Sequence, residues 1–199
     1  MKVSKKILVA VPLFLVILTG CSSGGEDKQI VDVPAATDTF VRADSKVEVP
    51  NSFVSKEGDF SINFPGQPKA ESTLVDGKNG SKVNMTLYTY DMDDNNAFLV
   101  ASSDGSSAAI AEDGPRKVLK NEQSGQLSSF GAKAAYMEKE SDYGKFPGLM
   151  YKIKTSEGFY VVAHTYIVES RMYQLEMISN IEPTDDQIKS FIGSFKLLK

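Results

Sequence analysis

The residue whose chemistry is easiest to predict is Cys21, the single cysteine of this 199-residue chain. A basic leader with Lys2, Lys5 and Lys6 precedes it, followed by an uncharged apolar run over 7–18. That run is too short for a helix to cross about 30 Å of hydrocarbon, and a basic leader, a short apolar run and small residues in this order are typical of a secretory signal. We therefore expect the chain to be exported.

The Leu-Thr-Gly-Cys sequence at 18–21 resembles the lipobox of bacterial lipoproteins. In that class the cysteine thiol receives a diacylglyceryl group and the chain is cut before it. The resemblance implies a signal peptide over 1–20, a palmitate-bearing lipid anchor on Cys21, and localisation at a membrane of the bacterial cell envelope. Ser22 in place of an aspartate would imply the outer membrane if the bacterium is Gram-negative. An ordinary cleaved signal with a chance cysteine is the alternative.

His164 is the single histidine, so Ser-His-Asp catalysis would have to use it. It lies within an apolar stretch over 159–168, and the sequence has no G-x-S-x-G nucleophile elbow to accompany it. One histidine is also too few for a standard zinc site, and an acylated Cys21 is no nucleophile. We therefore expect no catalytic residue, no metal site and no cofactor, and a His164 that is packed or hydrogen-bonded within its strand.

An acidic run offers oxygen ligands of the kind that calcium uses. Asp91, Asp93 and Asn95 match the first three ligand positions of an EF-hand loop, but Asn96 stands where glycine is required and Ser102 stands where the closing glutamate belongs. The simpler interpretation is a solvated turn between two strands, built from residues that favour turns. A weak divalent-cation site remains an alternative.

Two aromatic residues, Tyr143 and Phe146, lie on a short connection between two predicted strands. Exposed aromatic side chains on a rigid turn suit contact with a ligand or partner, because they bury a large area at little entropic cost. We predict them as ligand-binding residues. The alternative is that Phe146 is part of the core and Tyr143 fills the edge of a sheet.

The charge balance limits the classes of partner. Of the 22 basic residues, three lie in the signal, which leaves 19 against 26 acidic residues, or a net charge of −7. This acidic balance argues against binding of nucleic acid and against an electrostatic hold on anionic lipid. The segment over 21–52, which begins with the lipidated cysteine, is rich in Ser, Gly and charge and predicts a flexible linker. The remainder, 53–199, is predicted to be one globular domain.

Alternating apolar residues predict most of a succession of strands within that domain, and two stretches that are apolar on both faces, 96–101 and 159–168, predict central strands. They are expected at about 60–64, 69–75, 83–90, 96–101, 132–141, 148–155, 159–168 and 172–179. A helix is predicted to begin after Gly114 and to end before Gly131, and a capping box at Thr184 and Gln187 opens a second helix. Because the connections between most strands are short, the sheet is predicted to be antiparallel and the fold class to be α+β.

Several short motifs recur in this order in one superfamily. They are Phe-Ser-Ile-Asn-Phe-Pro-Gly-Gln-Pro at 60–68, Phe-Pro-Gly at 146–148, Arg-Met-Tyr-Gln-Leu at 171–175 and the Phe-to-Leu run at 191–197. Over 53–199 the chain resembles the PsbP-like domains, named for an extrinsic photosystem II subunit, and their DcrB-like and LpqN-like lipoprotein relatives. The resemblance implies an α/β/α sandwich on a central antiparallel β-sheet, with a non-catalytic role in binding proteins or lipids. It transfers no active-site residue.

Together these features predict a membrane-anchored envelope lipoprotein whose domain binds a protein or lipid partner. The membrane is contacted through Cys21, and no nucleic acid is expected as a partner. A cell-envelope enzyme and a weak divalent-cation-binding protein are the alternatives. An apolar cleft would favour a binding module, whereas ionisable groups clustered in a cleft would favour an enzyme.

Overall fold

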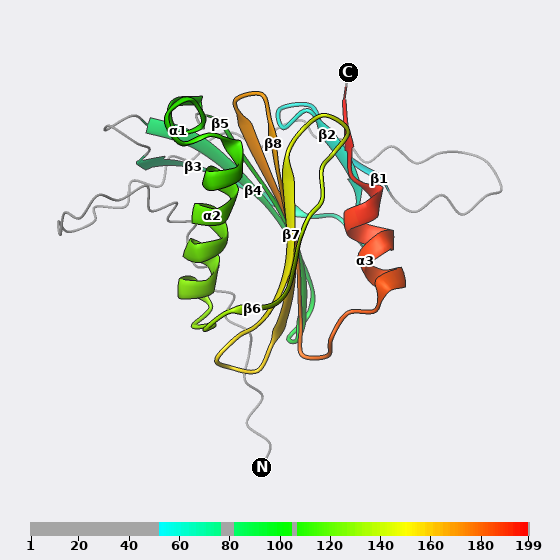
Figure 1. The fold of residues 1–199 in the computed structure, drawn as a ribbon. Helices are drawn as coiled ribbons and strands as arrows, with labels where there is room; N and C mark the ends of the chain where they lie inside the picture. Colours follow the sequence, from blue (N-terminus) through cyan, green and yellow to red (C-terminus); the bar gives the residue numbers. More distant parts are fainter. Residues whose placement is uncertain (1–51, 77–81, 105–106, 199) are drawn as a thin grey trace, which may run out of the picture.

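A seven-stranded sheet forms the middle layer of the computed structural model, which describes residues 52–76, 82–104 and 107–198 (Figure 1). The strands lie in the order β3-β4-β5-β9-β8-β7-β6, and every neighbouring pair is antiparallel. Their bounds are β3 Lys69–Asp76, β4 Lys82–Asp93, β5 Asn96–Asp104, β6 Ala135–Glu140, β7 Gly148–Lys154, β8 Tyr160–Val168 and β9 Arg171–Ser179. Short connections join most neighbouring strands, and they account for the antiparallel pairing.

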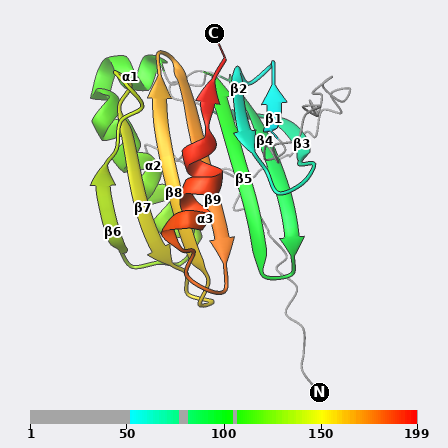
Figure 2. The ribbon, with the colours of Figure 1, turned by 90° about the vertical axis from the view of Figure 1, so that its right-hand side faces the viewer.

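Helices and a small second sheet cover the two faces of the large sheet. The helices are α1 Ser107–Asp113, α2 Pro115–Ser129 and α3 Asp185–Phe191, which continues into the 3-10 turn η2 Ile192–Ser194. The small sheet has the order β1-β2-β10, with β1 Ser52–Ser55, β2 Phe60–Asn63 and β10 Lys196–Leu197. Figures 1 and 2 show α1 and α2 on one face of the large sheet, and α3 with the small sheet on the other.

Each covered face has a hydrophobic core of its own. The core under α3 and the small sheet is largely aromatic and includes Phe53, Phe60, Phe64, Phe191 and Phe195. The core under α1 and α2 is mostly aliphatic; its larger members include Leu99, Leu119, Leu149, Ile153 and Val161. The central strands β8 and β9 contribute to both cores because successive side chains of a strand point to opposite faces. The predicted α+β class and three-layer sandwich are confirmed.

The helix ends follow the predicted sequence signals. At the end of α2, the Ala132 N–H donates to the Leu127 carbonyl over 2.8 Å, and Gly131 takes a φ of +60°. A Cβ at Gly131 would lie 2.7 Å from Ser156 Oγ, so a side chain there would also be crowded. At the start of α3, Thr184 and Gln187 form the predicted reciprocal capping box. The helix α2 therefore begins and ends close to where the sequence predicts, and α3 begins at the predicted capping box.

Three elements were not predicted from the sequence: α1 and the short strands β1 and β10. Four and two residues are too few for a repeating apolar pattern to stand out, so β1 and β10 depend on their pairing with β2. None of the helices in the described ranges is both long and apolar enough to cross a membrane. The predicted signal peptide, Cys21 and nearly all of the predicted linker lie outside those ranges.

Candidate functional site

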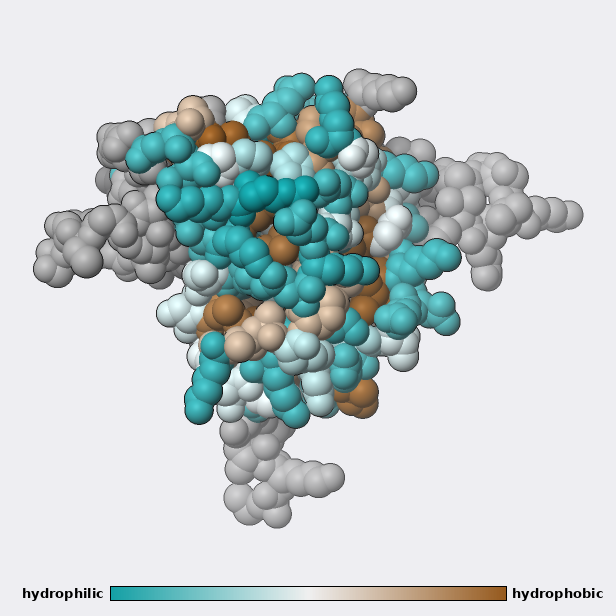
Figure 3. Space-filling model, viewed as in Figure 1, coloured by the Kyte–Doolittle hydropathy of each residue, from teal (hydrophilic) through white to brown (hydrophobic). Residues whose placement is uncertain are grey.

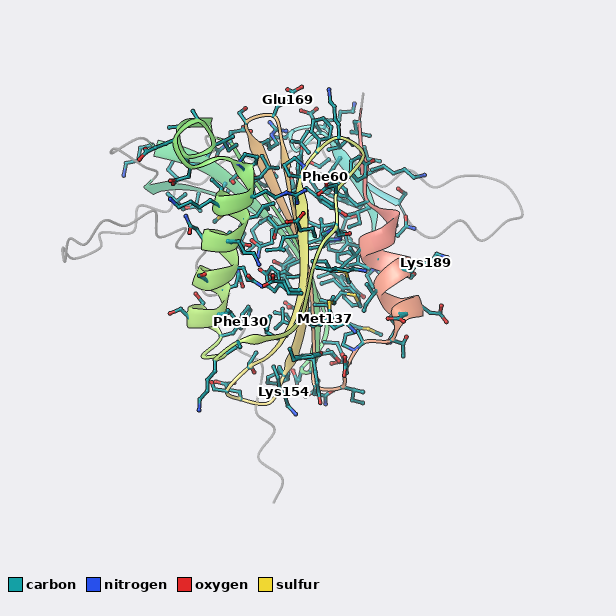
Figure 4. The ribbon with its side chains drawn as sticks, in the orientation of Figure 1. Phe60, Phe130, Met137, Lys154, Glu169 and Lys189 are labelled. Atoms are coloured by element: carbon teal, nitrogen blue, oxygen red, sulfur yellow. The ribbon has the colours of Figure 1, made fainter. Side chains whose placement is uncertain are left out.

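Five polar side chains gather in the otherwise apolar layer between α2 and the large sheet. We call them the polar island: Glu122 of α2, Tyr151 of β7, Thr165 of β8, and Gln174 and Glu176 of β9. All five are buried, with Glu122 at 5% and Glu176 at 2% exposure. Figure 4 shows how side chains fill this layer. Two carboxyl groups from facing elements are thus enclosed together.

The pairing register brings the strand members of the island to the α2 face. Thr165 lies opposite Gln174, and Ala163 lies between Tyr151 and Glu176 in neighbouring strands. Since side chains opposite each other in a sheet share a face, these polar groups become neighbours. On α2, residues four apart share one side of the helix, so Glu122 points toward the sheet in line with the buried Val118.

Hydrogen bonds link the members of the island unequally. The Tyr151 hydroxyl donates to both Glu122 oxygens over 3.3 and 3.2 Å, and Thr165 Oγ1 donates to Glu122 Oε2 over 3.2 Å. The Gln174 Nε2 donates to Glu176 Oε1 over 2.5 Å and the Gln174 amide also hydrogen-bonds Glu122. Among the described residues, the Oε1 atoms of Gln174 and Gln126 are the buried side-chain oxygens left without a partner. The Gln174 side-chain amide, which contacts both carboxyl groups, therefore carries an oxygen that accepts no hydrogen bond.

Burial governs the titration of the two carboxyl groups. It raises the pKa of Glu122 to about 7, while the hydrogen bonds from Thr165, Tyr151 and Gln174 act to lower it. Burial, together with the neighbouring Glu122 charge, raises the pKa of Glu176 to about 8. Because the groups interact, they titrate as a pair. The arrangement can bind and release protons near neutral pH, and α2 separates it from solvent.

His164 lies on the opposite face of β8, where it is 6% exposed. Its Nε2 is 2.9 Å from the Ser141 carbonyl oxygen, which only accepts, so Nε2 carries the proton. Its Nδ1 then accepts from the Tyr166 hydroxyl over 3.0 Å. Burial lowers the pKa of His164 to about 4. The prediction of a packed, hydrogen-bonded strand histidine is confirmed.

The predicted ligand-binding residues lie on a tight loop between β6 and β7. Tyr143 and Phe146 exchange both backbone hydrogen bonds, at 2.9 and 3.0 Å. The Tyr143 ring packs edge-on against Tyr166 and Phe195 at the border of the aromatic core. Phe146 is half-buried, with the Lys145 ammonium 5.3 Å from its ring centre. Tyr143 thus has a packing role of its own, and ligand contact by either residue stays a prediction.

The acidic run at Asp91 forms the connection between β4 and β5. The Asp93 carboxylate accepts hydrogen bonds from the Asn95 backbone N–H and the Asn96 side-chain amide, which lower the pKa of Asp93. Both partners belong to the same turn, as is usual for aspartate in turns. Among the described residues, no group of three or more His, Cys, Asp or Glu side chains is placed to hold a metal ion.

The polar island was not predicted from the sequence. Each of its carboxyl residues carries a weak signal: Glu176 interrupts a strand that is otherwise mostly apolar, and Glu122 follows Val118 by one helical turn. Neither signal shows that the two side chains meet, because they lie 54 positions apart on different elements. Their contact depends on how α2 packs across β7 and β8.

Comparisons with known proteins add two solved structures. No family model matches the chain, and no curated protein matches it. One solved structure is the cyanobacterial PsbP, CyanoP, from Synechocystis sp. PCC 6803, with 12% identity and a TM-score of 0.44, covering 79% of this chain and 98% of that chain. A protein from Bacteroides thetaiotaomicron VPI-5482 matches with 16% identity and a TM-score of 0.42, covering 74% of this chain and 48% of its own. A PsbP protein is thus among the matches, but similarity at this level carries no argument about function.

Proposed function

We propose that the protein is an exported lipoprotein, anchored to an envelope membrane through Cys21, whose domain is a non-catalytic accessory module for a protein or lipid partner. The anchor rests on the Leu-Thr-Gly-Cys sequence at 18–21. The proposal of a non-catalytic role rests on His164, because both of its ring nitrogens are hydrogen-bonded, one to Ser141 and one to Tyr166. A histidine held in this way has no nitrogen left for a substrate or a nucleophile.

The polar island bears on the enzyme alternative. Clustered ionisable groups would favour an enzyme if they lined a cleft. Here α2 and the sheet enclose both carboxyl groups, so a substrate does not reach them in this arrangement. On the face seen in Figure 3, hydrophilic residues cover most of the surface and hydrophobic ones form small areas among them. The enclosure of the carboxyl groups counts against the enzyme alternative, while the accessory role rests on the engaged ring of His164.

The anchor is tested by replacing its acceptor thiol. In Cys21→Ala, palmitate labelling and signal removal at this site should be lost. Two or three acyl chains contribute about 0.8 kcal/mol per buried CH₂ group, whereas one chain holds a protein only marginally. Ser22→Ala is the matched control, because it changes the neighbouring residue and keeps the thiol. Palmitate labelling that persists in Cys21→Ala would refute the anchor.

The accessory role is tested by crosslinking in native membranes. A photo-reactive residue at Phe146 should give a discrete crosslinked product, because this loop presents a half-buried aromatic ring. The same residue at Ser128, an exposed position on α2, serves as the control. Phe146→Ala, combined with a crosslinker at the adjacent Lys145, should reduce the yield of that product severalfold. Equal yields from the loop and from Ser128 would count against this contact.

A further inference from the structure

The carboxyl pair has no positive countercharge. The groups that shift the pKa values of Glu122 and Glu176 are Thr165, Tyr151, Gln174 and, for Glu176, Glu122 itself; none of these described residues carries a positive charge. Two enclosed carboxylates without a countercharge would cost several kcal/mol, so charge neutralisation must accompany folding. The pair therefore needs a bound positive species, of which a proton is the smallest.

The hydrogen bonds around Gln174 indicate where that proton lies. Gln174 Oε1 is buried without a donor, while its Nε2 contacts Glu176 Oε1. A protonated Glu176 supplies the missing donor, because its O–H can bond the amide oxygen once the amide turns over. Glu122 already accepts from Tyr151 and Thr165, which suits the ionised partner of the pair. One proton on Glu176 thus gives the buried amide oxygen of Gln174 a donor.

The pair also contributes much of what holds α2 in place. Three of the five buried residues of α2 are polar: Glu122, Gln123 and Gln126. The charged contacts of its outer side are partly exposed and therefore weak; they link Arg116 to Asp142 and Glu140, and Lys120 to Glu138. Gln123 adds a bond to Glu138. The seating of α2 should thus depend on the protonation of the island.

A hinge is available at the start of α2. Gly114 separates α1 from α2 with a φ of +78°, and a Cβ built there would meet nothing within 4 Å. Open space and a backbone conformation that favours glycine let the chain bend at this point without a collision. α1 packs against α2, and the Phe130 carbonyl beyond the other end of α2 accepts from the Ser156 N–H, so α2 loosens from the sheet only if these contacts yield.

We propose that Glu122 and Glu176 form a proton-binding latch that seats α2 on the sheet, and that loss of the shared proton to solvent lets α2 loosen from the sheet. The reaction releases one proton and leaves two carboxylates, which repel each other unless one reaches water. Release would expose the apolar side of β7, β8 and β9 that α2 covers. The latch goes beyond the proposed accessory function and does not depend on it.

Side chains from several elements surround the latch. From α2 itself and from β6, the titratable groups are Lys120 and Glu138, whose contact holds the pKa of Glu138 below its usual range. From β7 the facing group is Tyr151, whose pKa burial raises well above its ordinary value, and β8 contributes the neutral Thr165. Glu138 therefore stays ionised and Tyr151 stays neutral between pH 6 and pH 9, so the carboxyl pair is the group of the island that changes there.

The experiment is hydrogen exchange of the folded mature protein between pH 6 and pH 9, read by mass spectrometry and corrected for the intrinsic pH dependence of exchange. Peptides from α2 should lose protection by about tenfold per pH unit for each proton released. Peptides from α3 should stay protected, since its capping box and aromatic contacts lie on the other face. Simultaneous loss in α2 and α3 would mean global unfolding and would overturn the latch.

Neutral variants separate the latch from other causes. The double variant Glu122→Gln with Glu176→Gln should keep α2 protected at pH 9, because neither side chain ionises. Glu138→Gln is the matched control, since it removes an α2 contact outside the island and should retain the pH dependence. A double variant that responds like the wild type would overturn the proposal. So would wild-type protection restored at pH 9 by added calcium, which would assign a metal ion to the pair.

Discussion

His164 gives the clearest prediction at the scale of one residue. Its pKa is about 4 in the folded protein and about 6.5 in an unfolded chain. Between these values the unfolded state binds more protons, so the stabilisation from the neutral ring is complete above pH 6.5 and is lost as the pH falls toward 4. The difference of about 2.5 units corresponds to at most about 3 kcal/mol. Urea unfolding of the wild type at pH 7 and pH 4.5 should show this loss.

His164→Gln supplies the comparison, because its amide can donate to Ser141 and accept from Tyr166 without titrating. Its free energy of unfolding should change by about 2–3 kcal/mol less than that of the wild type between the two pH values. His164→Ala should lower the melting temperature at pH 7, with a loss of about 1–3 kcal/mol from the missing bonds and packing. Identical pH profiles for wild type and His164→Gln would show that the folded ring titrates normally.

The start of α3 gives the prediction at the scale of an element. Thr184 Oγ1 accepts from the Gln187 N–H, and the Gln187 side chain accepts from the Thr184 N–H. Thr184→Ala removes the first of these bonds and should cost about 1 kcal/mol. Because α3 carries the buried Ile188 and Phe191 into the aromatic core, the loss should appear in global unfolding by urea.

Thr184→Ser is the control for this element, since serine keeps the hydroxyl acceptor and should stay within about 0.5 kcal/mol of the wild type.

Gly131 at the end of α2 tests a second helix boundary. Gly131→Ala places a Cβ at positive φ near Ser156 and should cost about 1–2 kcal/mol, whereas Gly131→Asn, which tolerates this conformation better, should cost less. Equal losses from both substitutions would mean that crowding, not backbone conformation, decides this position.

At the scale of the whole molecule, the prediction is that residues 53–199 fold without the preceding segment. Phe53 is 1% exposed, and its ring lies 5.3 Å from Tyr88 and 5.7 Å from Phe64, measured between ring centres. A chain starting at Phe53 should unfold cooperatively, with a stability within about 2 kcal/mol of the mature protein. Chemical denaturation of both measures this. A greater loss would mean that residues before Phe53 pack as structure.

Phe53→Ala, made in the full-length mature protein, tests whether the Phe53 ring is itself part of the folded domain. Removing this ring leaves a cavity among Phe60, Phe64 and Tyr88, which should cost about 3–5 kcal/mol. A loss of unfolding free energy of this size would show that the folded domain includes Phe53. A cost below about 1 kcal/mol would mean that the small sheet contributes little to the fold.

Neighbouring residues were enough to predict the elements whose patterns are long enough to repeat. Alternation predicted β2 and the strands of the large sheet, a Gly-Pro start and a glycine end predicted α2, and the capping box predicted α3. It also predicted that His164 would be packed, since a lone histidine in an apolar stretch of strand must satisfy its ring nitrogens. Local periodicity and local hydrogen bonding decide the strands and the helix ends, so neighbouring residues are enough to reveal them, whereas the Ser141 partner of His164 lies 23 positions away in the sequence.

Which surfaces meet depends on the fold as a whole. The strands β1 and β10 are too short to carry a pattern and form by pairing with β2 from opposite ends of the domain. The polar island arises in the same way: alternation says that Glu176 faces one side of β9, and helical spacing says that Glu122 lies beside Val118, but neither says that the two faces are the same layer. Long-range packing places both carboxyl groups in one enclosed space, and that burial gives them their unusual titration.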